Sequence, residues 1–401
     1  MEVPMKRFSF IILAFCIISV TPLFSETQLY NAESEHYIVY SEISAVHAQT
    51  ISQQMEKLFD TYNSYFHFTP SSLSGKMKVR IFSNKDRFNN YLKNVIDAEK
   101  EDFVYLHYSD IQKSELVGFS KEAQSDFDAS IAHQGSIQFL KAFISAPPLW
   151  MREGFAILFE TCSFDRNTGE LSYRENLSWL PTLRDIINSD EKDLLSLTSV
   201  LTMDQEEAKA NFEFFYPQSW GMVSFLMNTD KTEYQRMLWD SIRLLDADAK
   251  LVQNSKAIKD YILTWVSPDK LSNDFTSYLQ SRKTFNELVQ SGINAYKEES
   301  YAKAKPSFER ALELRTDHPL PFYYLGLLHY NNGNYEQAQV YYQKALSKGA
   351  DKATTYYAMG VNSFAAKQFD DATDYLNKAK ENSPDKYTEK VSKLLSRIEI
   401  E

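Results

Sequence analysis

Cysteine is scarce in this sequence, which has only two among its 401 residues. Cys16 lies in an apolar run near the N-terminus, and Cys162 is the other one. If that run is removed, no disulfide can form within the chain, so the fold must be stabilised by its core. Basic residues are also too few to balance the acidic ones, and the formal net charge is -11 at pH 7. This deficit argues against a nucleic-acid partner, which normally requires a basic face.

The sequence lacks an apolar run long enough to favour a membrane span. The run at residues 8–20 follows Lys6 and Arg7 and is itself followed by the sequence TPLFS, which ends at Ser25. This order is typical of a secretory signal peptide. We expect residues 1–25 to be cleaved, which leaves a mature chain without a membrane span in the periplasm or cell envelope. An uncleaved N-terminal anchor is the alternative.

The rest of the composition indicates a soluble, folded chain. Hydrophobic residues make up 43% and charged residues 24%, with 25 Tyr and 27 Phe, so extended disorder is not expected. The length allows two or three domains, each with its own core.

The first part of the chain has the pattern of an α+β domain. Alternation and β-branched residues predict strands, and residues that recur every three or four positions predict helices. The predicted strands are 35–41, 76–83, 103–108 and 116–119, and the predicted helices are 45–66, 84–92 and about 125–143.

Chemistry is concentrated at residues 129–160, where the helix contains His133, Gln134 and Ile137. In the H-E-x-x-H motif of zincins, two His residues four apart hold the metal, and the intervening Glu activates water. The same frame here reads H-Q-G-S-I. His133 matches the first ligand, whereas Gln134 replaces the base and Ile137 replaces the second ligand.

A second segment, WMREGFA at residues 150–156, is similar to the W-L-N-E-G-x-A segment of gluzincins, in which the Glu is the third zinc ligand. The resemblance implies that Glu153 matches this ligand. Farther on, FYPQSW at residues 215–220 resembles the tyrosine-containing helix of peptidase-MA-like proteins, so Tyr216 matches the tyrosine that supports the tetrahedral intermediate. The resemblance covers residues 30–280 and implies a zincin-like fold. We therefore expect a peptidase-MA-like domain at residues 26–282.

The departures at Gln134 and Ile137 predict that this domain is inactive. A carboxamide cannot act as a general base, and a hydrocarbon cannot complete the three protein ligands of a catalytic zinc. We therefore expect no cofactor, with zinc expected only if another residue such as His107 replaces the missing ligand. A further alternative is that the similarity is coincidental and His133 is an ordinary helix histidine. Glu153 and Glu160 share a helix face and, without zinc, are then hydrogen-bonded or solvent-facing carboxylates.

The last third of the chain repeats at an interval of 34 residues. Small and large residues recur in fixed columns, as in tetratricopeptide (TPR) repeats, where small residues let paired helices approach closely. The matching columns are Gly292, Gly326 and Gly360; Ala304, Ala338 and Ala372; and Phe308, Tyr342 and Leu376. We expect an all-α solenoid at residues 283–401, with repeats at 285–318, 319–352 and 353–386 and a capping helix after them.

TPR solenoids commonly bind proteins or peptides on their concave face. Candidate partner-binding residues on the first helix of each repeat are Asn294, Tyr324 and Asn362. For any single one of them, ordinary solvated surface is the alternative that the pattern favours. Two functions follow from the sequence. The first is a protein- or peptide-binding scaffold with a degenerate peptidase domain, and the second is a working zinc hydrolase with an altered ligand set. In a third interpretation, only the repeats have a partner.

Overall fold

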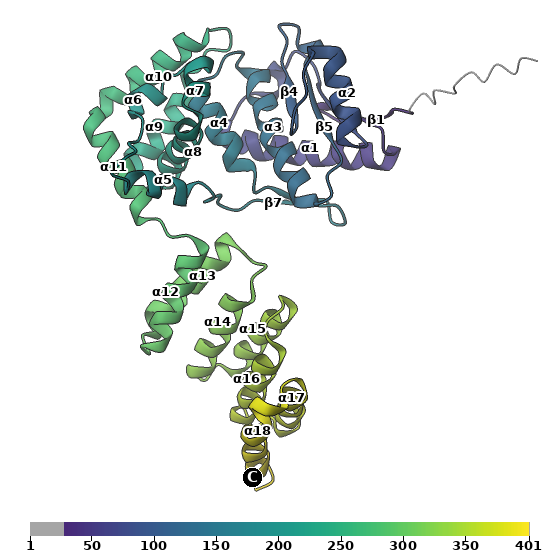
Figure 1. Cartoon of the computed structure of the whole chain (residues 1–401), viewed down its shortest axis with the longest axis vertical. Helices are drawn as coiled ribbons and strands as arrows, with labels where there is room; N and C mark the ends of the chain where they lie inside the picture. The colour runs from purple at the N-terminus through teal and green to yellow at the C-terminus, as the bar shows by residue number, and fades with distance from the viewer. Residues whose placement is uncertain (1–27, 401) are drawn as a thin grey trace, which may run out of the picture.

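The computed structural model describes residues 28–400, so the predicted signal peptide at residues 1–25 lies outside the described part. The described chain is mostly helical, with α-helices labelled α1 to α18 and a small α/β region near the N-terminus. Figure 1 shows the α/β region on one side of the N-terminal part, further helices beside it, and the last helices extending away as an arm. None of the described helices has both the length and the apolar character that a membrane crossing requires.

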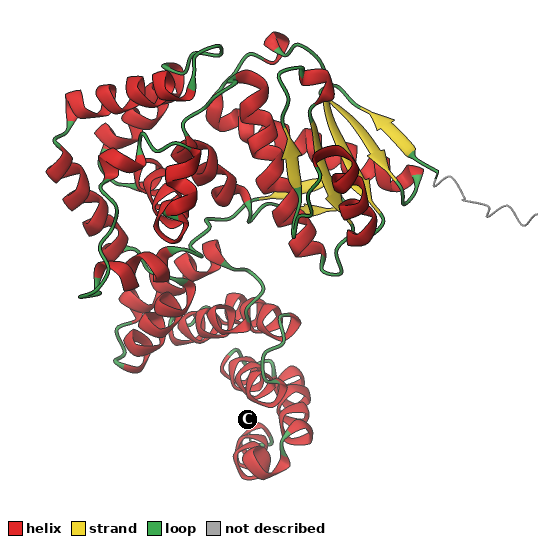
Figure 2. Cartoon of the chain, turned by 45° about the horizontal axis from the view of Figure 1, so that its top comes forward, coloured by secondary structure: helices red, strands yellow, loops and turns green. Residues whose placement is uncertain are grey.

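The α/β region is built on a five-stranded mixed sheet, drawn in yellow in Figure 2. Its order is β1-β2-β3-β5-β4, in which β2, β3 and β5 are parallel and the two outer strands are antiparallel to their neighbours. The strands are β1 (Tyr30–Glu33), β2 (Tyr37–Ser41), β3 (Met77–Phe82), β4 (Val104–Leu106) and β5 (Glu115–Phe119). The short strand β4 therefore forms one edge of the sheet.

Alternation along β3 divides the helices between the two faces of the sheet. Val79 and Ile81 are fully buried on the face covered by α1 (Ala45–Phe66) and α3 (Gln124–Phe143). Arg80 points to the other face, where its guanidinium lies 5.2 Å from the ring centroid of Tyr91 on α2 (Lys85–Ile96). Helix α3, which carries the zincin-like sequence, is thus held between the sheet and the helices that follow.

The predicted strands and helices of this region are present, and α2 extends four residues beyond the predicted end at residue 92. Strand β1 was not predicted, because its sequence YNAE is short and polar and the strand forms only because it pairs with β2. The coarse prediction of an α/β region followed by helical repeats is confirmed, whereas the zincin-type fold stays a prediction.

Helices α4 to α11 follow in the chain and lie beside the α/β region (Figure 1). They are α4 (Leu149–Phe159), α5 (Leu180–Ile187), α6 (Leu197–Val200), α7 (Gln205–Ala210), α8 (Phe212–Asn228), α9 (Thr232–Arg243), α10 (Leu251–Trp265) and α11 (Pro268–Ser281). A small hairpin of β6 (Ser163–Asp165) and β7 (Glu170–Ser172) follows α4. Pro147 and Pro148 separate α3 from α4, as proline requires at such a break.

Close approach of paired helices explains the glycine column of the repeats. A Cβ atom added at Gly326 would lie 2.5 Å from the Tyr342 ring, and one at Gly292 would lie 2.7 Å from the Phe308 ring. The helices of the arm are α12 (Phe285–Lys297), α13 (Tyr301–Leu314), α14 (Pro319–Asn331), α15 (Tyr335–Ser347), α16 (Lys352–Ala365), α17 (Phe369–Asn382) and α18 (Pro384–Ile398). They form three helix pairs and a final helix, as the sequence predicts.

The segment that leads into α5 joins the first helix pair to the N-terminal part of the chain. Glu175 accepts from both Arg282 and Arg310. Leu177 packs against the apolar cluster of α12 and α13, and Arg184 donates to both carboxylate oxygens of Glu287 at 2.8 and 3.0 Å. The first pair is thereby fixed to the preceding helices by both polar and apolar contacts.

Candidate functional site

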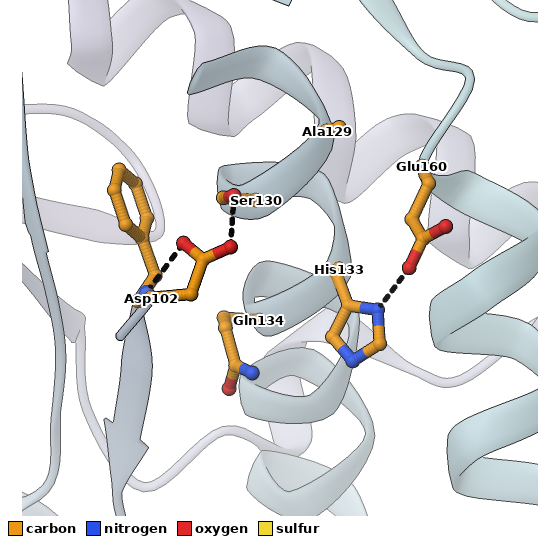
Figure 3. Close-up of a pocket in the computed structure, with 7 residues that line it drawn as sticks. Asp102, Ala129, Ser130, His133, Gln134 and Glu160 are labelled. Carbon is orange, nitrogen blue, oxygen red and sulfur yellow. Dashed lines mark hydrogen bonds and ion pairs between the residues drawn. The ribbon is translucent and has the colours of Figure 1, made fainter. Parts of the chain in front are cut away.

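His133 is held in one orientation by the carboxylate of Glu160, the residue that directly follows helix α4. It lies half-buried on α3, and its Nδ1 atom donates to Glu160 Oε1 at 2.8 Å. Figure 3 shows the ring between Glu160 on one side and Gln134 on the other. An Nδ1–H bond to a carboxylate leaves Nε2 as the free acceptor of the neutral imidazole, which is the tautomer of a metal-ligating histidine.

Glu153 is the group that the free Nε2 atom of His133 faces. Its side chain is only 8% exposed, and Oε2 lies 4.0 Å from His133 Nε2. The other oxygen, Oε1, accepts from Arg152 Nε at 2.8 Å and also from Nη2 of the same guanidinium. The positive charge beside Glu153 is therefore supplied by the neighbouring Arg152.

The position of Glu153 is fixed by the close packing of α4 on α8. A Cβ atom added at Gly154 would lie 2.4 Å from the backbone oxygen of Ser219, so the small residue after Glu153 lets the two helices touch. Helix α8 also carries Tyr216, whose pKa is raised by burial and by the charge of Glu153. Tyr216 therefore lies close enough to Glu153 to be affected by its charge, and the role that the resemblance implies for it stays a prediction.

Gln134 is bound to the edge of the sheet. Its Oε1 atom accepts a hydrogen bond from the backbone N–H of Tyr105 on β4 at 3.1 Å. A backbone N–H at a strand edge needs such a partner when it is partly buried. Gln134 therefore has a structural role here.

Ile137 and Lys141 continue the face of α3 that begins at His133, because they follow it at intervals of four residues. Ile137 is half-buried and offers no lone pair. Burial, together with the charge of Arg152, lowers the pKa of Lys141 to about 8. Within residues 28–400 the Lys141 ammonium has no hydrogen bond and no ion pair, so this face carries a weakly solvated cation.

His107, the candidate for a replacement ligand, lies just after β4 and is exposed. Partial burial and the charges of Lys141 and Arg152 lower its pKa. Across residues 28–400, no group of three or more His, Cys, Asp or Glu is arranged to hold a metal ion. The ligands present do not fit a catalytic zinc, which needs three.

Two cavities meet at the His133–Glu160 pair. The smaller has a volume of about 300 Å³ and is bounded by Asp102, Ser130 and Gln134. Figure 3 shows Asp102 just before β4, opposite Ser130 and Gln134 on α3. The larger, of about 960 Å³, opens between α4, α5 and the start of α8. Both cavities include His133 and Glu160 in their walls.

Several residues of the site could not be assigned from the sequence. Glu160 was expected only to be hydrogen-bonded or solvent-facing, and its bond to His133 agrees with the first of these. Arg152 lies inside the gluzincin-like segment, but no spacing rule predicts that its guanidinium pairs with the carboxylate of the adjacent Glu153. Trp179 and Phe212 line the larger cavity although they are far from His133 in sequence, so only the tertiary fold brings them together.

The three candidate partner-binding residues of the repeats differ in their environments. Asn294 is exposed and accepts from Gln290 Nε2 at 2.8 Å. Tyr324 is half-buried and stacks on Phe308, with ring centroids 5.0 Å apart. Asn362, expected on the surface, is only 1% exposed and donates to the backbone oxygen of Tyr335. The expectation for Asn362 is corrected, because its amide is used between neighbouring helices.

Comparison with known proteins identifies two matching families. Residues 129–266 match a family described as a protein of unknown function (DUF1570), and residues 319–349 match the tetratricopeptide repeat family (TPR_2). No curated protein matches the chain. The first match includes His133, Glu153 and Tyr216 but assigns no activity to them. The second supports the TPR nature of the helical arm, and TPR repeats are protein-interaction modules.

Proposed function

We propose that this chain is an exported protein- or peptide-binding scaffold that combines a catalytically degenerate peptidase-like domain with a TPR interaction module. The signal peptide is residues 1–25, the peptidase-like domain is residues 26–282, and the TPR module is residues 283–401. After signal cleavage the protein acts in the periplasm or cell envelope. Its cleft and its repeats both bind polypeptide, and neither hydrolyses it.

The observation that carries this proposal is the hydrogen bond from the Tyr105 N–H to Gln134 Oε1 at 3.1 Å. In a zincin the corresponding carboxylate must face the metal-bound water. The amide of Gln134 instead supports β4, and an amide cannot accept the proton of water at neutral pH. Loss of one positioned acid–base group costs roughly two to four orders of magnitude in rate, which supports a non-hydrolytic function.

The electrostatics around Glu153 support the same conclusion. One oxygen of its buried carboxylate is paired with Arg152, so the negative charge is compensated without a metal ion. Among residues 28–400, a zinc ion placed there would find His133 and Glu153 but no third protein ligand, whereas catalytic zinc needs three. Helices α4 and α8 pack closely at Gly154 and so hold Glu153 in place.

The proposal is tested by incubating the chain from residue 26 onward with a diverse peptide library, then measuring both retention and cleavage by mass spectrometry. Peptides are expected to be retained intact, with no effect of a chelator. Chelator-sensitive cleavage would overturn the proposal. A Tyr105→Pro variant, which lacks the N–H that Gln134 binds, serves as a control for the integrity of the cleft.

The second candidate is a working metallohydrolase with an altered ligand set, which uses the repeats to dock its substrate. The observation that favours it is the Nδ1–H bond of His133 to Glu160 at 2.8 Å, since a metal-ligating histidine normally donates its other ring N–H to a carboxylate, which orients the ring. This function requires that His133→Ala and Glu153→Ala each abolish both metal binding and turnover. Unchanged metal content in those variants would rule it out.

A further inference from the structure

The larger cavity has the size and lining of a binding site for an organic group. Its volume of about 960 Å³ lies at the upper end of the range of roughly 300–1,000 Å³ for ligand pockets. Four aromatic side chains contribute to the wall: Trp179, Phe212, Phe214 and Tyr216. Phe212 is 59% exposed, so a large apolar surface stands at the rim without a partner from the described chain.

The charged residues of the same wall are mostly acidic. Glu160, Asp185 and Glu213 face the cavity with Lys192 as the only ammonium group among its lining residues. Glu160 is bound by His133. Asp185 and Glu213 are exposed, and within residues 28–400 neither side chain has a hydrogen bond or an ion pair. Two carboxylates are therefore available to a ligand.

Resting on the proposed function, we propose that this cavity receives a Lys or Arg side chain of an extended polypeptide segment, with apolar residues on either side of it. The carboxylates of Asp185 and Glu213 bind the cationic end. The aromatic rings cover the hydrocarbon stem and attract the cation through their π faces. No cation of the described chain lies over these four rings, so the rings are free for an external one.

The smaller cavity supports an extended rather than a compact occupant. It continues on the other side of the His133–Glu160 pair, so a segment that crosses the pair has room in both directions. Besides Glu160, its acidic residue is Asp102, which is already paired with Lys121 at 2.8 Å. The preference for a cationic side chain therefore resides in the larger cavity. The net charge of -11 on the whole chain also favours the approach of a basic segment.

The test uses hexapeptides that are acetylated and amidated at their ends, with a central Lys, norleucine or Glu between leucines. Calorimetry of the chain from residue 26 onward measures their Kd, and mass spectrometry checks that they remain intact. The Lys peptide is expected to bind at least about tenfold more tightly than the other two. The double variant Asp185→Asn/Glu213→Gln is expected to remove this advantage and to leave the norleucine peptide unchanged.

The control variant Asp190→Asn/Glu191→Gln makes the same change of net charge at exposed residues outside the cavity wall. It is expected to bind the Lys peptide as the unmodified chain does. Equal affinity for all three peptides, or a Lys advantage that survives Asp185→Asn/Glu213→Gln, would overturn the inference and leave the proposed function standing. Cleavage of the peptides would instead overturn the proposed function, while the dependence on Asp185 and Glu213 would still decide the inference.

Discussion

Gln134 Oε1 and the backbone N–H of Tyr105 lie 3.1 Å apart and form a hydrogen bond between helix α3 and the edge strand β4. In the described chain, the amide oxygen of Gln134 makes no other hydrogen bond. It joins the helix that carries His133 to the strand that ends beside His107. A change at Gln134 is therefore expected to affect the stability of this edge as well as the chemistry of the cleft.

Replacing Gln134 by Leu removes the acceptor and leaves the Tyr105 N–H without its partner. We expect the free energy of unfolding to fall by about 1–2 kcal/mol, as measured by urea denaturation. Gln134→Glu keeps an acceptor oxygen and is expected to stay within about 0.5 kcal/mol of the unmodified chain at neutral pH. The matched control is Gln53→Leu, at an exposed position of α1. Equal effects of the two leucine variants would contradict the structural role of Gln134.

Lys141 makes the stability of this region depend on pH. Burial and Arg152 lower its pKa from 10.5 to about 8, so the cost of the buried charge is fully present below pH 8 and decreases as the folded protein loses the proton between pH 8 and 10.5. We expect Lys141→Met to stabilise the chain by about 1 kcal/mol at pH 7, allowing for solvent screening. The gain should shrink at pH 10.

Urea midpoints at pH 7 and pH 10 check this prediction. Lys57→Met, at an exposed position of α1, is the control and should show the same small effect at both pH values. A Lys141→Met gain that is independent of pH would indicate improved packing instead of a removed charge.

Glu175 fixes the first helix pair of the repeats to the rest of the chain. Its side chain is 14% exposed and is paired with Arg282 and Arg310. Glu175→Gln leaves Arg282 without a carboxylate partner and leaves Arg310 with only the exposed Glu313, and we expect a loss of about 1–3 kcal/mol. Calorimetry should show a lower transition temperature, and limited proteolysis should be faster near residues 282–284. Glu313→Gln, which removes an exposed partner of Arg310, should have little effect in either measurement.

Close helix packing predicts the effect of a single added methyl group in the repeats. Gly326→Ala places Cβ about where the Tyr342 ring now lies, at 2.5 Å, and we expect a loss of about 1–3 kcal/mol. Gln343→Ala, at an exposed position of α15, is the control and should change stability by less than about 0.5 kcal/mol. Equal stability of the two variants in urea unfolding would contradict the close packing of α14 on α15 at Gly326.

Patterns with a fixed period were the most predictable part of the fold. The 34-residue columns of Gly326 and Tyr342 locate the helix pairs because one contact is repeated in each pair. Regular spacing also locates α1 and α3. Strand β1 and the β6–β7 hairpin were not predicted, since each is short and is stabilised mainly by pairing with another strand.

Predicting the site from the sequence was possible only for residues inside a motif frame. His133 lies 4.0 Å from Glu153 and shares a cavity wall with Tyr216, and the roles that the resemblance implies for the three residues stay predictions. The Arg152–Glu153 pair and the Tyr105–Gln134 bond were not predictable, because each depends on side-chain direction after packing. For Asn362 the prediction itself was wrong. A polar residue on a repeat helix was expected at the surface, but Asn362 is buried and donates a hydrogen bond to the backbone oxygen of Tyr335.

The most direct test of the account is the zinc content of the purified chain from residue 26 onward, compared with that of Gln134→Glu/Ile137→His. Both proteins are dialysed against the same low zinc concentration and analysed by mass spectrometry of the intact protein. We predict no stoichiometric zinc in the unmodified chain and one zinc ion per chain in the double variant, because the reversion restores a third ligand and the carboxylate. One zinc ion per unmodified chain, together with chelator-sensitive peptide cleavage, would contradict the account.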